Sequence, residues 1–316
     1  MRRHIAAAFS VAHRLMALVL SVGVALSSAT ALGDSIYVAN GNANTVGKYT
    51  TTGAVVNASL ISESSSPEGI AVSGSNLFVG NTNGTIGEYT TSGAVVNASL
   101  ISGLGVQLSG IAVSGSNLFV ASCYNNTIGE YTTSGAVVNA SLVSGLVGPV
   151  GIAVSGSNLF VTNCYNNTIG EYTTSGAVVN ASLVSGSGLA DPGGIAVSGS
   201  DLFVANWNTG TISEYTTSGA VVNPSLISGL AYPVGVAVSG DKLYVTNLYA
   251  DTIGEYTTSG AVVNASLISG LSGNPWGIAV AQDVPEPSSA ALLFSFVAVG
   301  SLGLLAFTWR RQRRTA

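Results

Sequence analysis

A repeat of about 41 residues fills most of this 316-residue chain and constrains its fold more than any other feature. One copy, over residues 151–186, is GIAVSGSNLFVTNCYNNTIGEYTTSGAVVNASLVSG. The glycine that begins this phrase occurs six times, at Gly69, Gly110, Gly151, Gly194, Gly235 and Gly277. A fixed period in this range is typical of proteins built from repeated supersecondary units that pack against one another.

Each copy of the repeat predicts four short strands. The apolar and β-branched runs GIAVS, NLFVTN, TIGEYTT and AVVNASLV are separated by Gly, Ser and Asn residues that favour tight turns. Between residues 34 and 283 no run has the 3.6-residue period of an amphipathic helix. Four antiparallel strands in about 40 residues are typical of one blade of a β-propeller. Six copies therefore predict an all-β, six-bladed propeller.

The two ends of the repeat region predict how the ring closes. Residues 35–40 match the second strand of the repeat, whereas residues 277–280, the last strand, match the first. The C-terminal strand is therefore expected to complete the blade that the N-terminal strands begin, which would leave no open sheet in the ring.

The repeat resembles those of the YVTN and NHL propeller families. The similarity rests on FVTN at residues 160–163 and YVTN at residues 244–247, which are followed by Asn-Thr-Ile or Asp-Thr-Ile and later by Pro-x-Gly-Ile-Ala-Val. It covers nearly all of residues 32–283, which we expect to form one domain. The resemblance implies the propeller fold and leaves the activity open, because such repeats occur in binding scaffolds, in surface-layer proteins and in some enzymes.

Residues 1–31 have the pattern of a secretory signal peptide. Arg2 and Arg3 precede an apolar stretch over residues 15–25, and Ala-Thr-Ala at residues 29–31 fits a small-x-small cleavage site. We therefore expect export across the inner membrane.

Residues 284–316 resemble the PEP-CTERM sorting signal of Gram-negative bacteria. Pro285, Glu286 and Pro287 stand before an apolar run over residues 290–309, which is long enough to span a bilayer as a transmembrane helix. A basic cluster follows, formed by Arg310, Arg311, Arg313 and Arg314. The resemblance implies an exosortase as the processing partner, transient anchoring in the membrane, and release to the cell surface or the biofilm matrix. The same features also fit a plain C-terminal transmembrane anchor.

The composition of the repeat region excludes several functions. Residues 34–283 contain Lys48 and Lys242 against 13 carboxylates, a formal charge of −11, and they contain no arginine or histidine. We therefore expect no nucleic-acid partner. Without histidine there is no Ser-His-Asp triad, no histidine base and no histidine-ligated metal. Propellers of the virginiamycin B lyase type depend on histidine, so we expect the chain to match them poorly.

The six copies differ mainly in two loops, one between the second and third strands and one between consecutive copies. In a propeller both loops lie on the same face. We assign six aromatic residues to these loops: Trp207, Trp276, Tyr124, Tyr165, Tyr232 and Tyr249. Aromatic rings beside asparagines suit stacking on, and hydrogen bonding to, sugar rings. The alternative interpretation is that the rings cover the ends of the blades while the asparagines form turns.

A second candidate set lies where the second strand of each copy ends: Asn40, Asn81, Ser122, Asn163, Asn206 and Asn247. These side chains could line the channel mouth and bind a polar ligand or a cation, or they could satisfy backbone groups as the strand ends. Glu68 is the only carboxylate directly before the first strand of a copy, which makes it the candidate catalytic residue.

Cys123 and Cys164 occupy equivalent positions in consecutive copies. Equivalent positions on adjacent blades usually lie farther apart than the Cα separation of about 5.5 Å that a disulfide prefers. We therefore expect two free thiols.

Two functional classes remain from the sequence. The first is an exported, noncatalytic propeller of the surface or biofilm matrix that binds exopolysaccharide or a surface protein through its variable loops, without a metal or cofactor. The second is a lactonase-like hydrolase or lyase that acts in the propeller channel through Glu68 and a divalent cation such as calcium.

Overall fold

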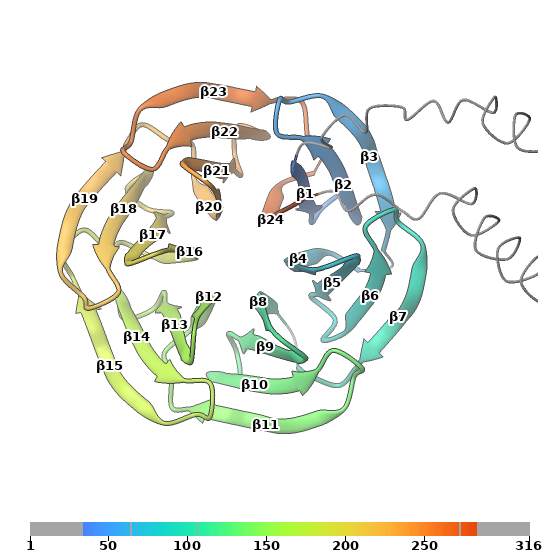
Figure 1. Cartoon of the computed structure of the whole chain (residues 1–316), viewed down its shortest axis with the longest axis horizontal. Helices are drawn as coiled ribbons and strands as arrows, with labels where there is room; N and C mark the ends of the chain where they lie inside the picture. Colours follow the sequence, from blue (N-terminus) through green and yellow to red (C-terminus); the bar gives the residue numbers. More distant parts are fainter. Residues whose placement is uncertain (1–33, 64, 106, 272, 283–316) are drawn as a thin grey trace, which may run out of the picture. The chain divides into compact units, whose positions relative to one another are not determined.

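The computed structural model describes residues 34–282, except residues 64, 106 and 272. In this part of the chain 24 strands form six four-stranded antiparallel sheets around a central axis, which is a six-bladed β-propeller (Figure 1). The all-β class, the number of blades and the four strands per blade are thus confirmed. The proposed signal peptide, the sorting motif and the C-terminal helix lie outside the described residues. Within the described ranges, no helix has the length and apolar character needed to cross a membrane.

The strands of each blade are ordered from the axis outward. The innermost strands are β4 (Pro67–Ser73), β8 (Leu108–Ser114), β12 (Pro149–Ser155), β16 (Pro192–Ser198), β20 (Pro233–Ser239) and β24 (Pro275–Gln282). The second strands are β1 (Asp34–Asn40), β5 (Asn76–Asn81), β9 (Asn117–Ser122), β13 (Asn158–Asn163), β17 (Asp201–Asn206) and β21 (Lys242–Asn247).

The outer half of each blade follows the same order. The third strands are β2 (Thr45–Thr50), β6 (Ile86–Thr90), β10 (Thr127–Thr132), β14 (Thr168–Thr173), β18 (Thr211–Thr216) and β22 (Thr252–Thr257). The outermost strands are β3 (Val55–Ser62), β7 (Val95–Ile101), β11 (Val137–Ser144), β15 (Val178–Ser185), β19 (Val221–Ile227) and β23 (Val262–Ile268). We number the blades from blade 1, which contains β1, to blade 6, which contains β23.

Blade 1 combines the two ends of the described chain, as the permuted repeat predicts. β24 pairs antiparallel with β1, with Ile278 opposite Val38 and Val280 opposite Ile36. Figure 1 shows the C-terminal β24 beside the N-terminal β1. In addition, Ser239 at the end of β20 donates a hydrogen bond to Asp34, which ties blade 6 to blade 1. The ring is therefore closed by hydrogen bonds and side-chain packing.

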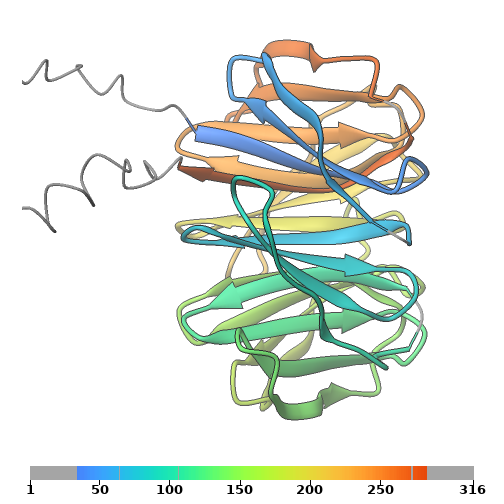
Figure 2. The ribbon, with the colours of Figure 1, turned by 90° about the vertical axis from the view of Figure 1, so that its right-hand side faces the viewer.

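The strands run between two faces of the ring (Figure 2). One face carries the loops that join second to third strands and the loops that join consecutive blades, and we call it the variable face. The opposite face carries the hairpin turns of the repeat. Asp34 and Gln282 are partners in the pairing of β1 with β24, so both ends of the described chain lie on the opposite face.

Apolar clusters fill the space between neighbouring blades. The cluster between blades 4 and 5, for example, contains Phe160 and Ile169 from one blade and Ile195, Val204 and Tyr215 from the next. The third-strand tyrosines Tyr49, Tyr89, Tyr131, Tyr172, Tyr215 and Tyr256 are all buried. Because the same residue types recur, the six interfaces are alike, and burial of this apolar area is the main source of stability.

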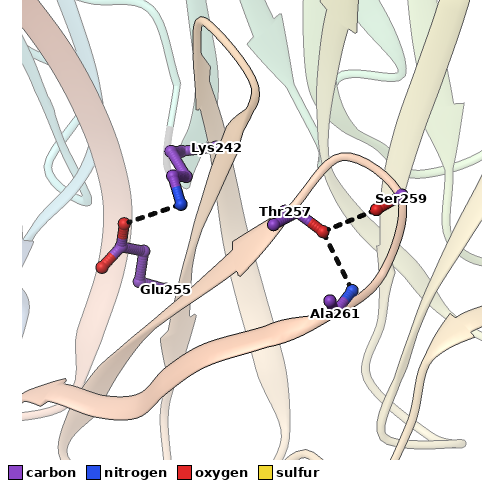
Figure 3. A network of polar contacts seen from close by, with 5 residues as sticks. All are labelled: Lys242, Glu255, Thr257, Ser259 and Ala261. Carbon is purple, nitrogen blue, oxygen red and sulfur yellow. Dashed lines mark hydrogen bonds and ion pairs between the residues drawn. The ribbon is translucent and has the colours of Figure 1, made fainter.

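The third strand of most blades carries a glutamate that pairs within the blade. Second-strand asparagines donate to Glu88, Glu130 and Glu171 in blades 2, 3 and 4 at 2.7–2.8 Å. In blade 6 Lys242 replaces the asparagine and lies 3.7 Å from Glu255 (Figure 3). These glutamates therefore have structural partners away from the axis.

The turn between the third and outermost strands repeats one hydrogen-bond pattern in all six blades. In blade 6 the Ala261 amide donates to Thr257 Oγ1 at 3.0 Å, and Thr257 Oγ1 lies 2.8 Å from Ser259 Oγ (Figure 3). The threonine side chain thus takes part in the turn, as is common for Ser and Thr in such positions.

The Asn-x-Ser phrase of the outermost strand has a structural role. In β11 the Ser141 amide donates to Asn139 Oδ1 at 3.1 Å, and the same bond occurs in every blade. The register between β10 and β11 also shifts at this point. An occupied amide and a shifted register make an exposed sheet edge a poor template for pairing with another chain.

Closure of the ring makes a stability prediction. A chain that ends at residue 274 lacks β24, so β1 loses its inner partner and the core of blade 1 opens. We expect its Tm to fall by more than roughly 10 °C, or the chain to fail to fold. A chain that ends at residue 283 keeps β24 and should melt within about 2 °C of the parent. Thermal unfolding followed by circular dichroism compares them, and equal Tm values would contradict this closure.

Candidate functional site at the channel mouth

The innermost strands of all six blades line a small cavity on the axis. Its volume is ≈ 90 Å³, and its lining includes Glu68 from β4 and Trp276 from β24. The second residue of each innermost strand varies between blades, with valine in two of them: Glu68, Ser109, Val150, Gly193, Val234 and Trp276. The residue that follows is always glycine. Most of the variation in the channel lining therefore falls at this one position, which lies at the end nearest the variable face.

The glycine is required because neighbouring inner strands approach backbone to backbone. A Cβ atom at Gly151 would lie 2.4 Å from the carbonyl oxygen of Gly193 in the next blade. Thr162 Oγ1 bridges the same two strands, accepting from the Gly151 amide at 2.7 Å and donating to the Gly193 carbonyl at 2.6 Å. The threonine of the YVTN-like phrase thus stabilises the contact between blades 4 and 5.

A β-bulge accompanies this contact. In blade 4 the pairing of β12 with β13 shifts register between Pro149 and Ile152, and each of the other blades has a shift near the same place in its inner pair. Bulges next to a functional site redirect a side chain. Here the bulge contains the variable residue, so the bulge decides how that residue is presented to the channel mouth.

The structure corrects the location of Trp276. It belongs to β24 and not to a variable loop, and its neighbour Pro275 pairs with Asn40. Pro and Trp interrupt the apolar pattern of the repeat, so the strand seemed to begin later in the sequence. The indole extends outward to Gly41, where a Cβ would lie 2.8 Å from Trp276 Cδ1.

Trp207, Tyr232, Tyr249 and Trp276 form a continuous group of rings, which we call the aromatic cluster. The ring centroids of Tyr249 and Tyr232 lie 4.5 Å apart in a stacked pair. Tyr232 is 5.8 Å from Trp207, which meets Trp276 edge-on at 6.0 Å. Tyr249 is exposed and the other three rings are half-buried. Four of the six predicted aromatic residues are therefore brought together, on blades 5, 6 and 1.

Trp207 contributes a polar group as well as a ring. Its indole lies over Gly193, where a Cβ would be 1.9 Å from Nε1, so only glycine fits beneath it. Nε1 is buried and has no hydrogen-bond partner among the described residues. Buried indole N–H groups usually find an acceptor. A ligand oxygen at the mouth can supply one.

Tyr124 and Tyr165 lie outside the aromatic cluster, on blades 3 and 4. Both are exposed. The Tyr165 ring packs on the backbone of Gly148, and its hydroxyl lies 3.7 Å from Cys123 Sγ. Tyr165 thus covers a thiol at the mouth.

Cys123 and Cys164 are free, as predicted, and each is 4% exposed. The expectation that the two positions lie too far apart for a disulfide stays a prediction. The neighbouring Cys164 side chain lowers the pKa of Cys123 to about 6, and the Cys123 side chain in turn raises the pKa of Cys164.

The strand-end asparagines are buried inside the blades, beside the mouth. The set is Asn40, Asn81, Asn163, Asn206 and Asn247. In blade 4 the Asn163 side-chain amide donates to Thr168 Oγ1 at 3.2 Å, and Asn81, Asn206 and Asn247 make the equivalent bond. These bonds agree with a role in ending the strand. Ligand contacts by these residues stay a prediction.

Glu68 is 8% exposed and lines the channel. Burial raises its pKa to about 7, and the negative charge of Cys123 adds to this effect. A carboxyl group with such a pKa can take up and release a proton near neutral pH. Across the described ranges, no group of three or more His, Cys, Asp or Glu side chains is arranged to hold a metal ion. The site is thus better suited to proton transfer than to coordination of a cation.

Sequence reasoning missed one part of this site. It did not identify the position before the repeated glycine as a channel position, so Ser109, Val150 and Val234 were not among its candidates. A comparison of the residue before each repeated glycine would have found all six variable channel positions.

The sequence matches the profile of the virginiamycin B lyase family over residues 21–238. The expected poor match to these propellers was therefore wrong. That expectation rested on the missing histidine, whereas a profile match over more than 200 residues depends on the repeated pattern of strands and turns. A comparison with curated proteins found no match.

Several solved structures share the fold. A chain of a nidogen/laminin complex has a TM-score of 0.67 at 18% identity, covering 79% of this chain and 98% of that chain. A protein of unknown function from Bacteroides caccae gives 0.61 at 16%, with coverages of 79% and 100%. A catalytically inactive histidine-to-alanine variant of virginiamycin B lyase from Staphylococcus aureus, with quinupristin, gives 0.53 at 19%, with 77% and 78%. At these identities the similarity establishes the fold alone.

The raised pKa of Glu68 predicts a pH-dependent stability. From the ordinary value of 4.5 up to about 7, the folded state holds a proton that the unfolded state releases, so the free energy of unfolding falls as pH rises through this window. The loss amounts to about 3 kcal/mol. Glu68→Gln should remove it, so the variant gains stability relative to the parent as pH rises from 4.5 to 7.

Urea unfolding between pH 4 and 8 measures this difference. Glu88→Gln is the matched control, because Glu88 is equally buried at 8% exposure but lies in β6 and accepts a hydrogen bond from Asn76. A stability difference between the parent and Glu68→Gln that stays constant with pH would contradict the titration.

Proposed function

Because the chain belongs to the virginiamycin B lyase family, we propose that it acts at the channel mouth of its propeller, where this member binds a polysaccharide without catalysis. We propose further that it does so as an exported protein of the cell surface or biofilm matrix. The aromatic cluster is the observation that carries the binding proposal.

The geometry of the aromatic cluster suits sugar rings. Partly exposed rings with centroids 4.5–6.0 Å apart extend from Tyr249 to Trp276 and offer apolar faces for stacking. The unpartnered Trp207 Nε1 adds a donor for a hydroxyl or ring oxygen. The strongly acidic repeat region, with Lys48 and Lys242 as its only basic residues, favours a neutral glycan over a polyanion.

A noncatalytic role agrees with the residues available. A histidine-to-alanine variant of the Staphylococcus aureus lyase is described as catalytically inactive, and residues 34–283 of this chain contain no histidine. The chemistry that needs this side chain is therefore not supplied by the repeat region of this chain.

The flanking sequences support the proposed location. Residues 1–31 fit a signal peptide, and Pro285, Glu286 and Pro287 with the following apolar run and arginines fit a sorting signal that an exosortase would process. Both ends of the described chain lie on the face opposite the mouth. A C-terminal anchor attached there would leave the mouth accessible to the matrix.

Binding of the purified protein to the exopolysaccharide of its source bacterium tests the proposal. We expect saturable binding that Trp207→Ala or Trp276→Ala weakens about tenfold or more, or ~1.4 kcal/mol, because each variant removes a stacking face. Val178→Ala, on the exposed outer strand β15, is the control and should bind like the parent. If the parent does not bind, or if both tryptophan variants bind as well as the parent, the glycan proposal fails and a protein partner becomes the better candidate.

A second candidate function rests on Glu68. A buried carboxyl group with a pKa of about 7 in the channel is suited to act as a general base in a lyase or lactonase-like hydrolase, with a divalent cation such as calcium as the possible cofactor. Calcium should then raise the Tm of the parent and have no effect on Glu68→Gln. If a chelator leaves glycan binding unchanged and calcium has no effect on Tm, the noncatalytic role is favoured instead.

A further inference from the structure

Glu68 is a buried carboxylate without a partner. It is 8% exposed and lines the axial cavity, and within the described ranges no hydrogen bond or ion pair reaches its side chain. Glu88 and Glu130 are equally buried, but each accepts a hydrogen bond from an asparagine of its own blade at 2.7–2.8 Å. A buried charge is costly unless it is paired. Glu68 therefore differs from the structural glutamates of the repeat and is available to a partner from outside the chain.

No basic side chain among the described residues lines this cavity. Lys48 on β2 and Lys242 on β21 are the only basic residues of the repeat region, and neither belongs to an innermost strand. Burial and the negative charge of Cys123 raise the pKa of Glu68 to about 7, which is the behaviour of a carboxyl group without a positive neighbour. The cavity thus lacks a positive charge that could balance Glu68.

The neighbours of Glu68 in the channel suit a compact cation. Its equivalents in the two adjacent blades are Ser109 and Trp276, and both line the same cavity. A Cβ at Gly69 would lie 2.9 Å from the Ser109 carbonyl oxygen, so β4 and β8 touch. A Cβ at Gly277 would clash with the backbone of Glu68, so β24 touches β4 as well. A hydroxyl can accept a hydrogen bond from an ammonium group, and an indole face attracts a cation.

We propose that this cavity binds the primary ammonium group of a ligand, with Glu68 as its counter-ion. The volume of ≈ 90 Å³ admits an ammonium or methylammonium group, since one water molecule needs about 10–15 Å³. A metal ion is a poorer occupant, because calcium takes about six to eight oxygen ligands and the described residues contain no group of three or more His, Cys, Asp or Glu side chains that could hold one. A neutral hydroxyl group would leave the carboxylate charge unbalanced.

Trp276 connects the cavity to the aromatic cluster. It lines the cavity and also meets Trp207 edge-on, with ring centroids 6.0 Å apart. A sugar that stacks on the cluster can therefore place an amino substituent beside Glu68. This step rests on the proposed glycan binding, and it names the ligand as a largely neutral polysaccharide in which some sugars carry free amino groups. The formal charge of −11 of the repeat region favours such a ligand.

Oligosaccharides that differ only in acetylation test the proposal. A tetramer of glucosamine carries free amino groups, whereas a tetramer of N-acetylglucosamine carries none. At pH 7.5 we expect the full-length protein to bind the glucosamine tetramer at least tenfold more tightly, as measured by isothermal titration calorimetry. Glu68→Gln should lose this preference. Glu88→Gln removes the same charge from an equally buried position and should keep the preference.

Methylammonium chloride separates this inference from the glycan proposal, because it carries the ammonium group without a sugar. Compared with sodium chloride at the same concentration, it should raise the Tm of the parent by about 2 °C or more and leave that of Glu68→Gln unchanged. The inference is overturned if methylammonium stabilises the two proteins alike, if the parent binds both tetramers equally or neither of them, or if Glu68→Gln keeps the preference. Binding of the source exopolysaccharide decides separately on the glycan proposal.

Discussion

The close approach of six inner strands at one repeated glycine is the constraint on which the rest of the molecule depends. A Cβ at Gly151 would come within 2.4 Å of a neighbouring carbonyl oxygen, so backbone contacts form the wall of the channel. The residue just before the glycine is left free to vary. The bulge at this position presents the variable side chain to the mouth, where Glu68 and Trp276 lie, and thereby concentrates chemical differences at one end of an otherwise repetitive ring.

Repetition explains why the turns on one face of the ring are alike in every blade, whereas the loops on the other face vary. The hairpin turns of the opposite face keep the same Thr and Ser hydrogen bonds in every blade, and the outer strands keep the same Asn-x-Ser bond. These contacts stabilise each blade, and the side chains that make them are engaged in structural hydrogen bonds. The loops of the variable face have no such requirement, and they carry both cysteines and three of the four rings of the aromatic cluster.

The repeat alone was sufficient to predict the fold, because period, strand pattern and permuted ends all constrain the same ring. The site was predicted in part. Tyr232, Tyr249 and Trp207 were assigned to the correct face from their loops, but Trp276 was misplaced because Pro275 hides the start of β24. The raised pKa of Glu68 arises from burial by neighbouring blades, which no local pattern encodes.

Ligand binding at the aromatic cluster is the central functional claim. The most direct test is the tryptophan emission of a Trp309→Phe protein, in which Trp207 and Trp276 are the remaining indoles, during titration with neutral oligosaccharides from the source polysaccharide. The account predicts a saturable change in emission that is strongly reduced when Trp207 is replaced by alanine. Unchanged emission at concentrations where the protein is retained by the polysaccharide would show that binding takes place elsewhere, and would contradict the account.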